Sequence, residues 1–112
     1  MIIELVGISV SLAKKQELGK ALVWLKGALH VQPGCLSCRV FQMGPAQDFA
    51  DFWHIEARWD GQRNLIRHLQ SDTYKKLLQL MELSAAPPVL EFLTVVELRG
   101  LDLVEAARIS PG

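Results

Sequence analysis

The chain has 112 residues, of which 50% are hydrophobic and 21% are charged, and its 12 basic and 12 acidic residues give a formal net charge of zero. This length suffices for one domain that buries about two thirds of its unfolded surface, so stability requires neither a metal nor a disulfide framework. Scattered basic residues argue against a nucleic-acid partner, and the lack of a signal-peptide pattern or of an apolar run of roughly 18 residues predicts a cytoplasmic protein without a membrane partner.

The first part of the chain predicts a strand followed by a helix. Residues 2–12 are rich in β-branched side chains and alternate towards their end, which predicts a strand with one apolar face formed by Val6, Ile8, Val10 and Leu12. From Ala13 to about Val31 the leucines recur at helical spacing, which predicts a helix that buries Leu18, Leu22, Leu25 and Leu29. Pro33 and Gly34 are expected to end it.

The middle of the chain predicts a hairpin and a second helix. Residues 35–43 and 51–59 flank the turn-rich stretch 44–48, a pattern typical of two antiparallel strands joined by a longer loop. Asp60 is the expected N-cap of a helix that runs to about Leu83. Its buried stripe is expected to comprise Leu65, Leu69, Leu77 and Leu80.

Two prolines and a last strand complete the predicted domain. Pro87 and Pro88 prevent the helix from continuing, and a fourth strand is expected from Val89 to Leu98. Residues 101–109 have the pattern of one or two helical turns, which are too short to be stable unless they dock on another surface. We therefore expect a single domain over residues 1–112, with 100–112 as a short tail.

The order strand, helix, strand, strand, helix, strand predicts an α+β fold of ferredoxin-like plan, with an antiparallel sheet and both helices on one face. The other face should alternate with polar residues. The last strand instead offers Leu93 and Val95 on one side and Phe92, Val96 and Leu98 on the other. Since the chain has no third layer to cover that second face, we expect a homodimer in which the same face of a second copy covers it.

Four stretches of the chain carry a family resemblance. They are residues 33–37 (PGCLS), 56–59 (EARW), 68–74 (HLQSDTY) and 87–88 (PP). Together they resemble the antibiotic biosynthesis monooxygenase family of dimeric α/β barrels over nearly the whole chain. The resemblance implies a dimer of ferredoxin-like units, each with a pocket between helices and sheet. It also implies members that oxidise quinols or polyketide phenols with O2 and without a prosthetic group.

Two branches of that family match this chain poorly. The heme-degrading branch has an Asn on its first strand and a ligating His on its second helix, whereas residues 2–12 contain no Asn and Leu78 occupies the ligand position. The polyketide-oxidising branch has a pocket Asn and Tyr where this chain has Ile55 and Leu65. The resemblance therefore implies neither heme nor any other cofactor or metal.

The branch that resembles quinol monooxygenases matches better. Its His follows the Trp of the third strand at the spacing of Trp59 and His68, and Leu-Gln follows as in residues 69–70. A further His of that branch is replaced by Thr73. This similarity makes His68 the candidate catalytic residue, a proton shuttle for a phenolic substrate. A helix-flank histidine bonded to a carbonyl or to water is the competing interpretation.

The candidate substrate pocket is aromatic. Trp59, Tyr74, Trp24 and Trp53 could wall a cavity that binds a small aromatic or quinol ligand. Each of them could equally be a packing residue, because aromatics at a junction of helix and sheet more often pack than bind.

Two further clusters suggest structural roles. His54, Glu56 and Arg58 share one face of their strand, where Arg39 could reach Glu56 across the hairpin, so a polar patch in the dimer face is favoured over catalysis. Two cysteines stand at positions 35 and 38. They begin a strand, and their odd spacing is expected to point the sulfurs to opposite faces, which argues against metal or redox chemistry.

Two functions remain in competition. The first is a cofactor-independent monooxygenase for a small aromatic or quinol, whose substrate supplies the electrons because no dinucleotide-binding motif or metal cluster is evident. The second is a non-catalytic ligand-binding or stress-related module that uses the same pocket. The sequence names neither the substrate nor a physiological partner.

Overall fold

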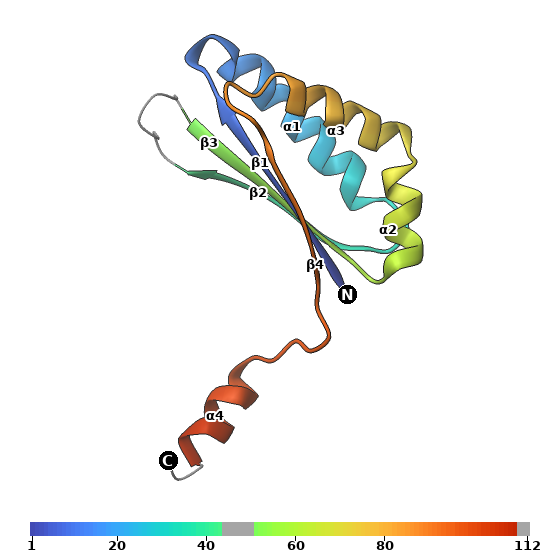
Figure 1. The fold of residues 1–112 in the computed structure, drawn as a ribbon, viewed down its shortest axis with the longest axis vertical. Coiled ribbons are helices and arrows are strands. Elements are labelled where there is room, and N and C mark those ends of the chain that lie inside the picture. The colour runs from blue at the N-terminus through green and yellow to red at the C-terminus, as the bar shows by residue number, and fades with distance from the viewer. Residues whose placement is uncertain (44–50, 110–112) are drawn as a thin grey trace.

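A four-stranded antiparallel sheet organises the protein (Figure 1). The structure is a computed structural model that describes residues 1–43 and 51–109. The strands are β1 (Ile2–Val10), β2 (Cys35–Met43), β3 (Asp51–Trp59) and β4 (Val89–Thr94), and they lie in the order β2-β3-β1-β4. Every pairing is antiparallel. The ferredoxin-like α+β prediction is confirmed, whereas the loop predicted at 44–48 lies outside the described residues.

The helices of the domain lie on one side of this sheet, as Figure 1 shows. A short 3-10 helix, η1 (Leu12–Lys14), leads into α1 (Lys15–His30), and α2 (Gln62–Leu69) and α3 (Asp72–Glu82) connect β3 to β4. The side of the sheet that faces them is called the covered face below, and the opposite side is called the open face.

The second predicted helix is in fact two helices. Ser71 separates them, because its hydroxyl donates to the carbonyl of His68 (2.6 Å) and accepts from the amide N–H of Tyr74 (3.1 Å) as the N-cap of α3. The predicted N-cap at Asp60 is also wrong. Gly61 is the N-cap of α2, and the Asp60 carboxylate instead accepts from the side-chain amide of Asn64.

The first and the last strand of the chain are both shorter than predicted. β1 ends at Val10, so Leu12 lies in η1 with 80% of its surface exposed instead of continuing the apolar face. β4 ends at Thr94 because its pairing partner β1 begins at Ile2, and one further hydrogen bond joins the N–H of Val95 to the carbonyl of Met1 (2.8 Å). Strand length is therefore limited by the partner as much as by the β propensity of the sequence.

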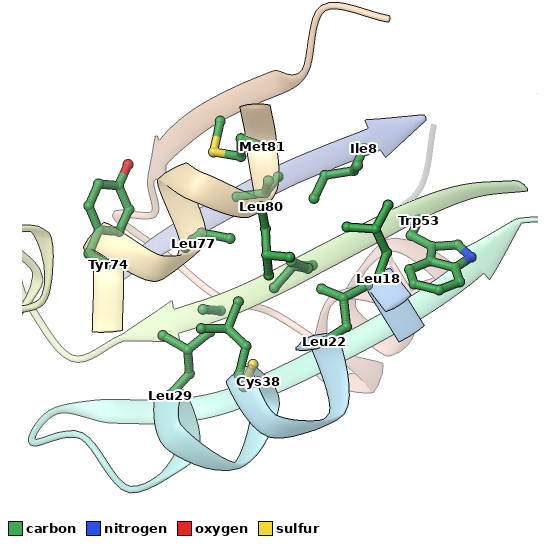
Figure 2. Close-up of a cluster of buried hydrophobic side chains, with 14 of the residues drawn as sticks. Ile8, Leu18, Leu22, Leu29, Cys38, Trp53, Tyr74, Leu77, Leu80 and Met81 are labelled. Atoms are coloured by element: carbon green, nitrogen blue, oxygen red, sulfur yellow. The ribbon is translucent and has the colours of Figure 1, made fainter. Parts of the chain in front are cut away.

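The hydrophobic core lies between the covered face and the helices (Figure 2). The alternating residues of β1 and the leucine stripe of α1 are buried as predicted, and the stripe of the second helical segment is buried except for Leu69, which is half-buried. Gly34 makes the turn into β2 with a φ of 81°, a left-handed conformation that favours glycine. The residues confirmed in the core are Val6, Ile8, Val10, Leu18, Leu22, Leu25, Leu29, Leu65, Leu77 and Leu80.

The open face mixes apolar and charged side chains. By register, Ile3 of β1 lies between Leu93 of β4 and Arg58 of β3. Leu5 of β1 lies between Glu91 of β4 and Glu56 of β3. None of these side chains is fully buried in the single chain. The apolar part of this face is therefore open to solvent unless another molecule covers it.

The C-terminal segment projects away from the sheet (Figure 1). Residues 95–100 lead to α4 (Leu101–Ile109), a helix at the predicted position, all of whose residues are exposed. Within residues 1–43 and 51–109, no helix has the length and apolarity needed to cross a membrane. The cytoplasmic location stays a prediction.

Candidate functional site

A buried pair formed by His68 and Glu4 is the centre of the candidate site. His68 Nε2 lies 3.0 Å from Glu4 Oε1, and the two side chains are 0% and 2% exposed. His68 comes from the last turn of α2, and Glu4 comes from β1, where it faces the covered side in phase with Val6 and Ile8. A buried carboxylate destabilises the fold unless polar partners replace the water that it has lost. The imidazole of His68 is such a partner and therefore stabilises Glu4 in the folded state.

Gln32 determines the tautomer of His68. Its Oε1 lies 2.7 Å from His68 Nδ1, and its Nε2 donates to Ser71 Oγ (3.3 Å). Ser71 uses its own hydrogen on the carbonyl of His68, so the group of Gln32 that faces Ser71 must be the NH2 donor. Nδ1 therefore carries a hydrogen. The contact between Nε2 and Glu4 then holds one more proton, which makes an ion pair when it is on the imidazole and a neutral pair when it is on the carboxyl group.

Two aromatic rings fix the imidazole in place. Trp59 stacks on it with the ring centroids 4.3 Å apart and the planes 22° from parallel, and Tyr74 meets it edge-on at 5.1 Å. The indole N–H of Trp59 also donates to Glu4 Oε1 at 3.4 Å. Because both rings are themselves buried, His68 cannot turn towards solvent without disrupting the core.

The second carboxylate oxygen of Glu4, Oε2, is buried and has no hydrogen-bond partner within residues 1–43 and 51–109. Burial, and secondarily the Glu4 carboxylate, raises the pKa of the Tyr74 hydroxyl above its ordinary value. Tyr74 therefore stays protonated at neutral pH.

A small cavity of about 150 Å³ has His68 among its lining residues, although the His68 side chain itself is 0% exposed. Its lining comprises Gln32, Pro33, Asn64, Arg67, His68 and Ser71. Trp59 and Tyr74 are not among these residues, so they support His68 from behind instead of walling this cavity. In the structure the Gln32 amide occupies the position at Nδ1 that a ligand hydroxyl entering from this cavity would take.

The remaining two predicted aromatic residues lie elsewhere. Trp53 lines a separate groove of about 850 Å³ between α1 and the β2–β3 edge of the sheet, which does not include His68. Trp24 is half exposed on α1, and the ammonium of Lys76 lies over its ring, 4.3 Å from the centroid. The structure thus brings His68, Trp59 and Tyr74 together and separates Trp53 and Trp24 from them.

On the open face, Glu56 forms its ion pair with a different arginine from the one predicted. Arg39 does lie opposite Glu56 in the strand register. The ion pair of Glu56 is nevertheless made with Arg58, two residues along its own strand, at 3.4 Å. The predicted bridge between Arg39 and Glu56 is therefore wrong.

The two cysteines do not point to opposite faces. A β-bulge between residues 35 and 37 shifts the register, so Cys35 pairs with Trp59 and Cys38 pairs with Ala57, both of which face the covered side. Both are free thiols, and burial raises the pKa of Cys38 to about 11. A thiol with so high a pKa is a poor nucleophile. In the described part of the chain, no three side chains of His, Cys, Asp or Glu are grouped as a metal site.

Sequence reasoning missed three members of the site: Glu4, Gln32 and Ser71. Glu4 had a detectable signal, because it stands in phase with the buried positions of an otherwise apolar strand. Ser71 also had one, since it precedes Asp72 as a helix N-cap would. Gln32, in the turn after α1, had none.

Comparison with known proteins agrees with this fold. A structure from Deinococcus radiodurans, described as a proposed antibiotic biosynthesis monooxygenase, is similar with a TM-score of 0.76 at 20% identity, covering 89% of this chain and 97% of that one. One from Caulobacter crescentus with the same description has a TM-score of 0.69 at 22% identity and covers 86% and 90%. One from Mycobacterium tuberculosis has a TM-score of 0.72 at 16% identity and covers 88% and 98%. At these identities the likeness establishes the fold alone.

The family assignment rests on the sequence. No curated protein matches this chain. The sequence model of the family described as antibiotic biosynthesis monooxygenase matches residues 1–80, which contain β1 to β3, α1, α2 and every side chain of the buried site. The chain belongs to the antibiotic biosynthesis monooxygenase family.

Proposed function

We propose that this protein is a cofactor-independent monooxygenase that oxidises a small phenol or quinol with O2 and uses His68 as the proton acceptor. The observation that supports the proposal is the buried His68–Glu4 pair at the inner end of a small polar cavity. A carboxylate that holds a proton on one imidazole nitrogen lets the other nitrogen act as a base once that second nitrogen has released its own hydrogen, the arrangement that general-base catalysis requires.

The first step moves a proton. A substrate hydroxyl entering the cavity displaces the Gln32 amide from His68 Nδ1, the hydrogen on Nδ1 is released to solvent, and Glu4 keeps the hydrogen on Nε2. His68, now neutral with a free lone pair on Nδ1, accepts the phenolic proton there. Trp59 and Tyr74 contribute by holding the ring, so that no reorientation is needed during the transfer.

The substrate supplies the electrons for the second step. The phenolate transfers electrons to O2, one oxygen atom becomes bonded to a ring carbon, and the other leaves as water. A quinol with a free ring position plus O2 thus gives a hydroxyquinone plus one water molecule. Atoms and electrons balance in this equation without a separate reductant.

Oxygen uptake with a panel of reduced naphthoquinones tests the proposal. We expect uptake above the uncatalysed rate, and His68→Asn should lower turnover by roughly 10² to 10⁴, the usual contribution of a general base. His30→Asn is the matched control, because His30 is exposed at the end of α1 and should not change turnover.

A second variant separates catalysis from folding. Glu4→Gln keeps an oxygen that can accept from His68 but removes the charge, so it should lower turnover while the chain stays folded. If the wild type consumes no oxygen with any quinol, or if His68→Asn turns over at the wild-type rate, the proposed reaction or the proposed base is wrong.

A non-catalytic ligand-binding module is the second candidate. The observation that favours it is the groove of about 850 Å³, which is lined by apolar residues and lysines around Trp53 and has no contact with His68. A ligand that binds there should raise the melting temperature in a concentration-dependent way without oxygen uptake. Quenching of Trp53 fluorescence, lost in Trp53→Phe, would locate the binding.

We also propose that the open face forms a homodimer. Ile3, Leu5 and Leu93 are apolar side chains left partly exposed on this face in the single chain, and a second copy would bury them. Light scattering should then give about twice the chain mass of 12.5 kDa. Leu93→Asp should shift the population to the monomer mass. A wild-type protein that remains monomeric at micromolar concentration would contradict the proposal.

A further inference from the structure

The helices α1 and α3 lie side by side over the covered face (Figure 1), and their outer side faces solvent. A residue two positions after a buried one is rotated by about 200° around a helix, so it points away from the core. Apolar residues occur at these positions, where a surface helix normally carries polar ones. The two rows, called the outer stripes below, are Lys20, Trp24, Gly27 and Val31, which follow the four buried leucines of α1, and Lys76, Gln79 and Leu83, which follow Tyr74, Leu77 and Met81 of α3.

Exposed apolar side chains surround one aromatic ring on this outer side. Val31 is 79% exposed and Trp24 is 50% exposed, and Leu83 and the neighbouring Val23 are exposed as well. The ammonium of Lys76 lies over the Trp24 ring, 4.3 Å from its centroid, and so connects the two stripes. A pocket of about 260 Å³ between them has Trp24, Lys76 and Leu83 in its lining. The outer side therefore combines apolar and cationic groups in one continuous surface.

The charges of the chain are divided unequally between these helices and the rest. Residues 12–31 and 62–83, which contain η1 and α1 to α3, include eight basic and three acidic residues, a formal charge of +5. Because the whole chain has a formal net charge of zero, the remaining residues carry −5. The zero net charge thus hides a positive helical layer. Its eight basic residues, all exposed, are Lys14, Lys15, Lys20, Lys26, Arg63, Arg67, Lys75 and Lys76.

Most of these basic side chains are free to attract an anion. Lys14 pairs with Glu17 at 3.6 Å, and Lys15 pairs with Asp51 at 3.0 Å. The other six form no ion pair with any residue in 1–43 or 51–109. Attraction between exposed charges extends over about 10 Å at ordinary ionic strength. An anionic surface that contacts the outer stripes would therefore also attract the basic residues beside them.

We infer that the outer stripes of α1 and α3 dock on an anionic lipid bilayer, with Trp24 and Val31 in the interface and Lys20 at the headgroups. Binding at a bilayer surface requires exposed apolar side chains together with basic residues, and tryptophan favours the headgroup level. A nucleic acid would neutralise the lysines but would leave Val31 and Leu83 in water. A bilayer accommodates both kinds of side chain.

This surface departs from the sequence-based expectation of no membrane partner. That expectation depended on the lack of a signal-peptide pattern and of an apolar run long enough to cross a bilayer. Helices that lie on a bilayer do not need such a run. The inference is independent of the oxidation chemistry and of the homodimer, because neither His68 nor the open face takes part in it.

Vesicle binding by the full chain tests the inference. Sedimentation with vesicles of phosphatidylcholine should leave the protein in solution. Vesicles with about one third phosphatidylserine should carry it down at low salt and release it at high salt. Lipids with brominated acyl chains should quench the fluorescence of Trp24, since Trp53 and Trp59 are buried in the core. Trp24→Phe should remove this quenching while most of the binding remains.

Two pairs of charge reversals locate the contact. Lys20→Glu with Lys76→Glu should lower the partition coefficient at least about tenfold, because each basic residue near an anionic surface contributes about fivefold. Arg99→Glu with Arg108→Glu is the matched control, since it changes the net charge equally on the C-terminal segment and should lower the partition coefficient less than about threefold. All four positions are exposed, and thermal melts should show that both variants fold.

The inference is overturned if the protein does not bind phosphatidylserine vesicles, or if it binds phosphatidylcholine vesicles equally well. Equal losses in the two charge-reversal variants, or binding without quenching of Trp24, would place the contact on another surface and would also overturn it. Tighter binding to a DNA duplex than to the vesicles at the same salt concentration would assign the outer stripes to a nucleic acid instead.

Discussion

The two faces of the sheet each carry a glutamate paired with a basic side chain, and the surroundings of the two pairs differ. On the covered face, Glu4 and His68 are 2% and 0% exposed and 3.0 Å apart. On the open face, Glu56 and Arg58 are 17% and 28% exposed and 3.4 Å apart. Water can solvate the second pair in the single chain but cannot reach the first.

The comparison teaches that burial decides what such a pair can do. In the open-face pair, solvent screens the attraction and replaces a lost partner at little cost. In the covered pair, removal of one partner leaves a polar group without water, and the same isolation makes the position of a proton depend on a few side chains. Residue type alone does not distinguish the two cases.

The largest expected effect comes from removing the ring that isolates the covered pair. Trp59→Ala deletes a fully buried indole and its hydrogen bond to Glu4, so we expect a loss of about 3–5 kcal/mol in the free energy of unfolding, measured by urea denaturation. Trp24→Ala, at a half-exposed position, is the control and should lose far less. Similar losses in both variants would contradict the assignment of Trp59 to the core.

An intermediate effect is expected from breaking the covered pair itself. His68→Leu leaves the Glu4 carboxyl group buried without its imidazole partner, so we expect a loss of about 2–3 kcal/mol in the free energy of unfolding. The matched variant on the open face, Glu56→Gln, should change it by less than about 1 kcal/mol. If denaturation gave equal losses in the free energy of unfolding for the two variants, burial would not be what makes the covered pair more important for stability.

The smallest effect concerns a carboxylate at the end of the covered face. Hydrogen bonding from Gln42, and then from Lys15, holds the pKa of Asp51 below its ordinary value. Because the unfolded chain binds this proton more readily, Asp51 contributes stability above its ordinary pKa and loses it as the pH falls through the lowered pKa. Asp51→Asn should therefore flatten the acid limb of stability between about pH 5 and pH 2, measured by thermal melts. An unchanged slope would contradict this role.

Local patterns predicted most of the fold. Alternation in residues 2–10 and the leucine spacing of α1 correctly identified the buried positions, because one face of each element must be apolar to be covered. The errors fell where the backbone departs from regular geometry. The helix break at Ser71 depends on the bonds of one hydroxyl group, and the bulge at residues 35–37 reverses the direction of a cysteine side chain.

The candidate site shows which features the sequence alone predicts and which depend on the tertiary structure. The sequence predicted His68 and Trp59 as site residues from the family resemblance, it places Glu4 in phase with buried neighbours, and it predicted helical turns over residues 101–109. Only the tertiary structure decided that Glu4, 64 positions away, and Gln32, 36 positions away, meet on the two nitrogens of His68. The physical reason is that such contacts depend on which faces pack together, and that only packing excludes the water that would otherwise solvate these groups.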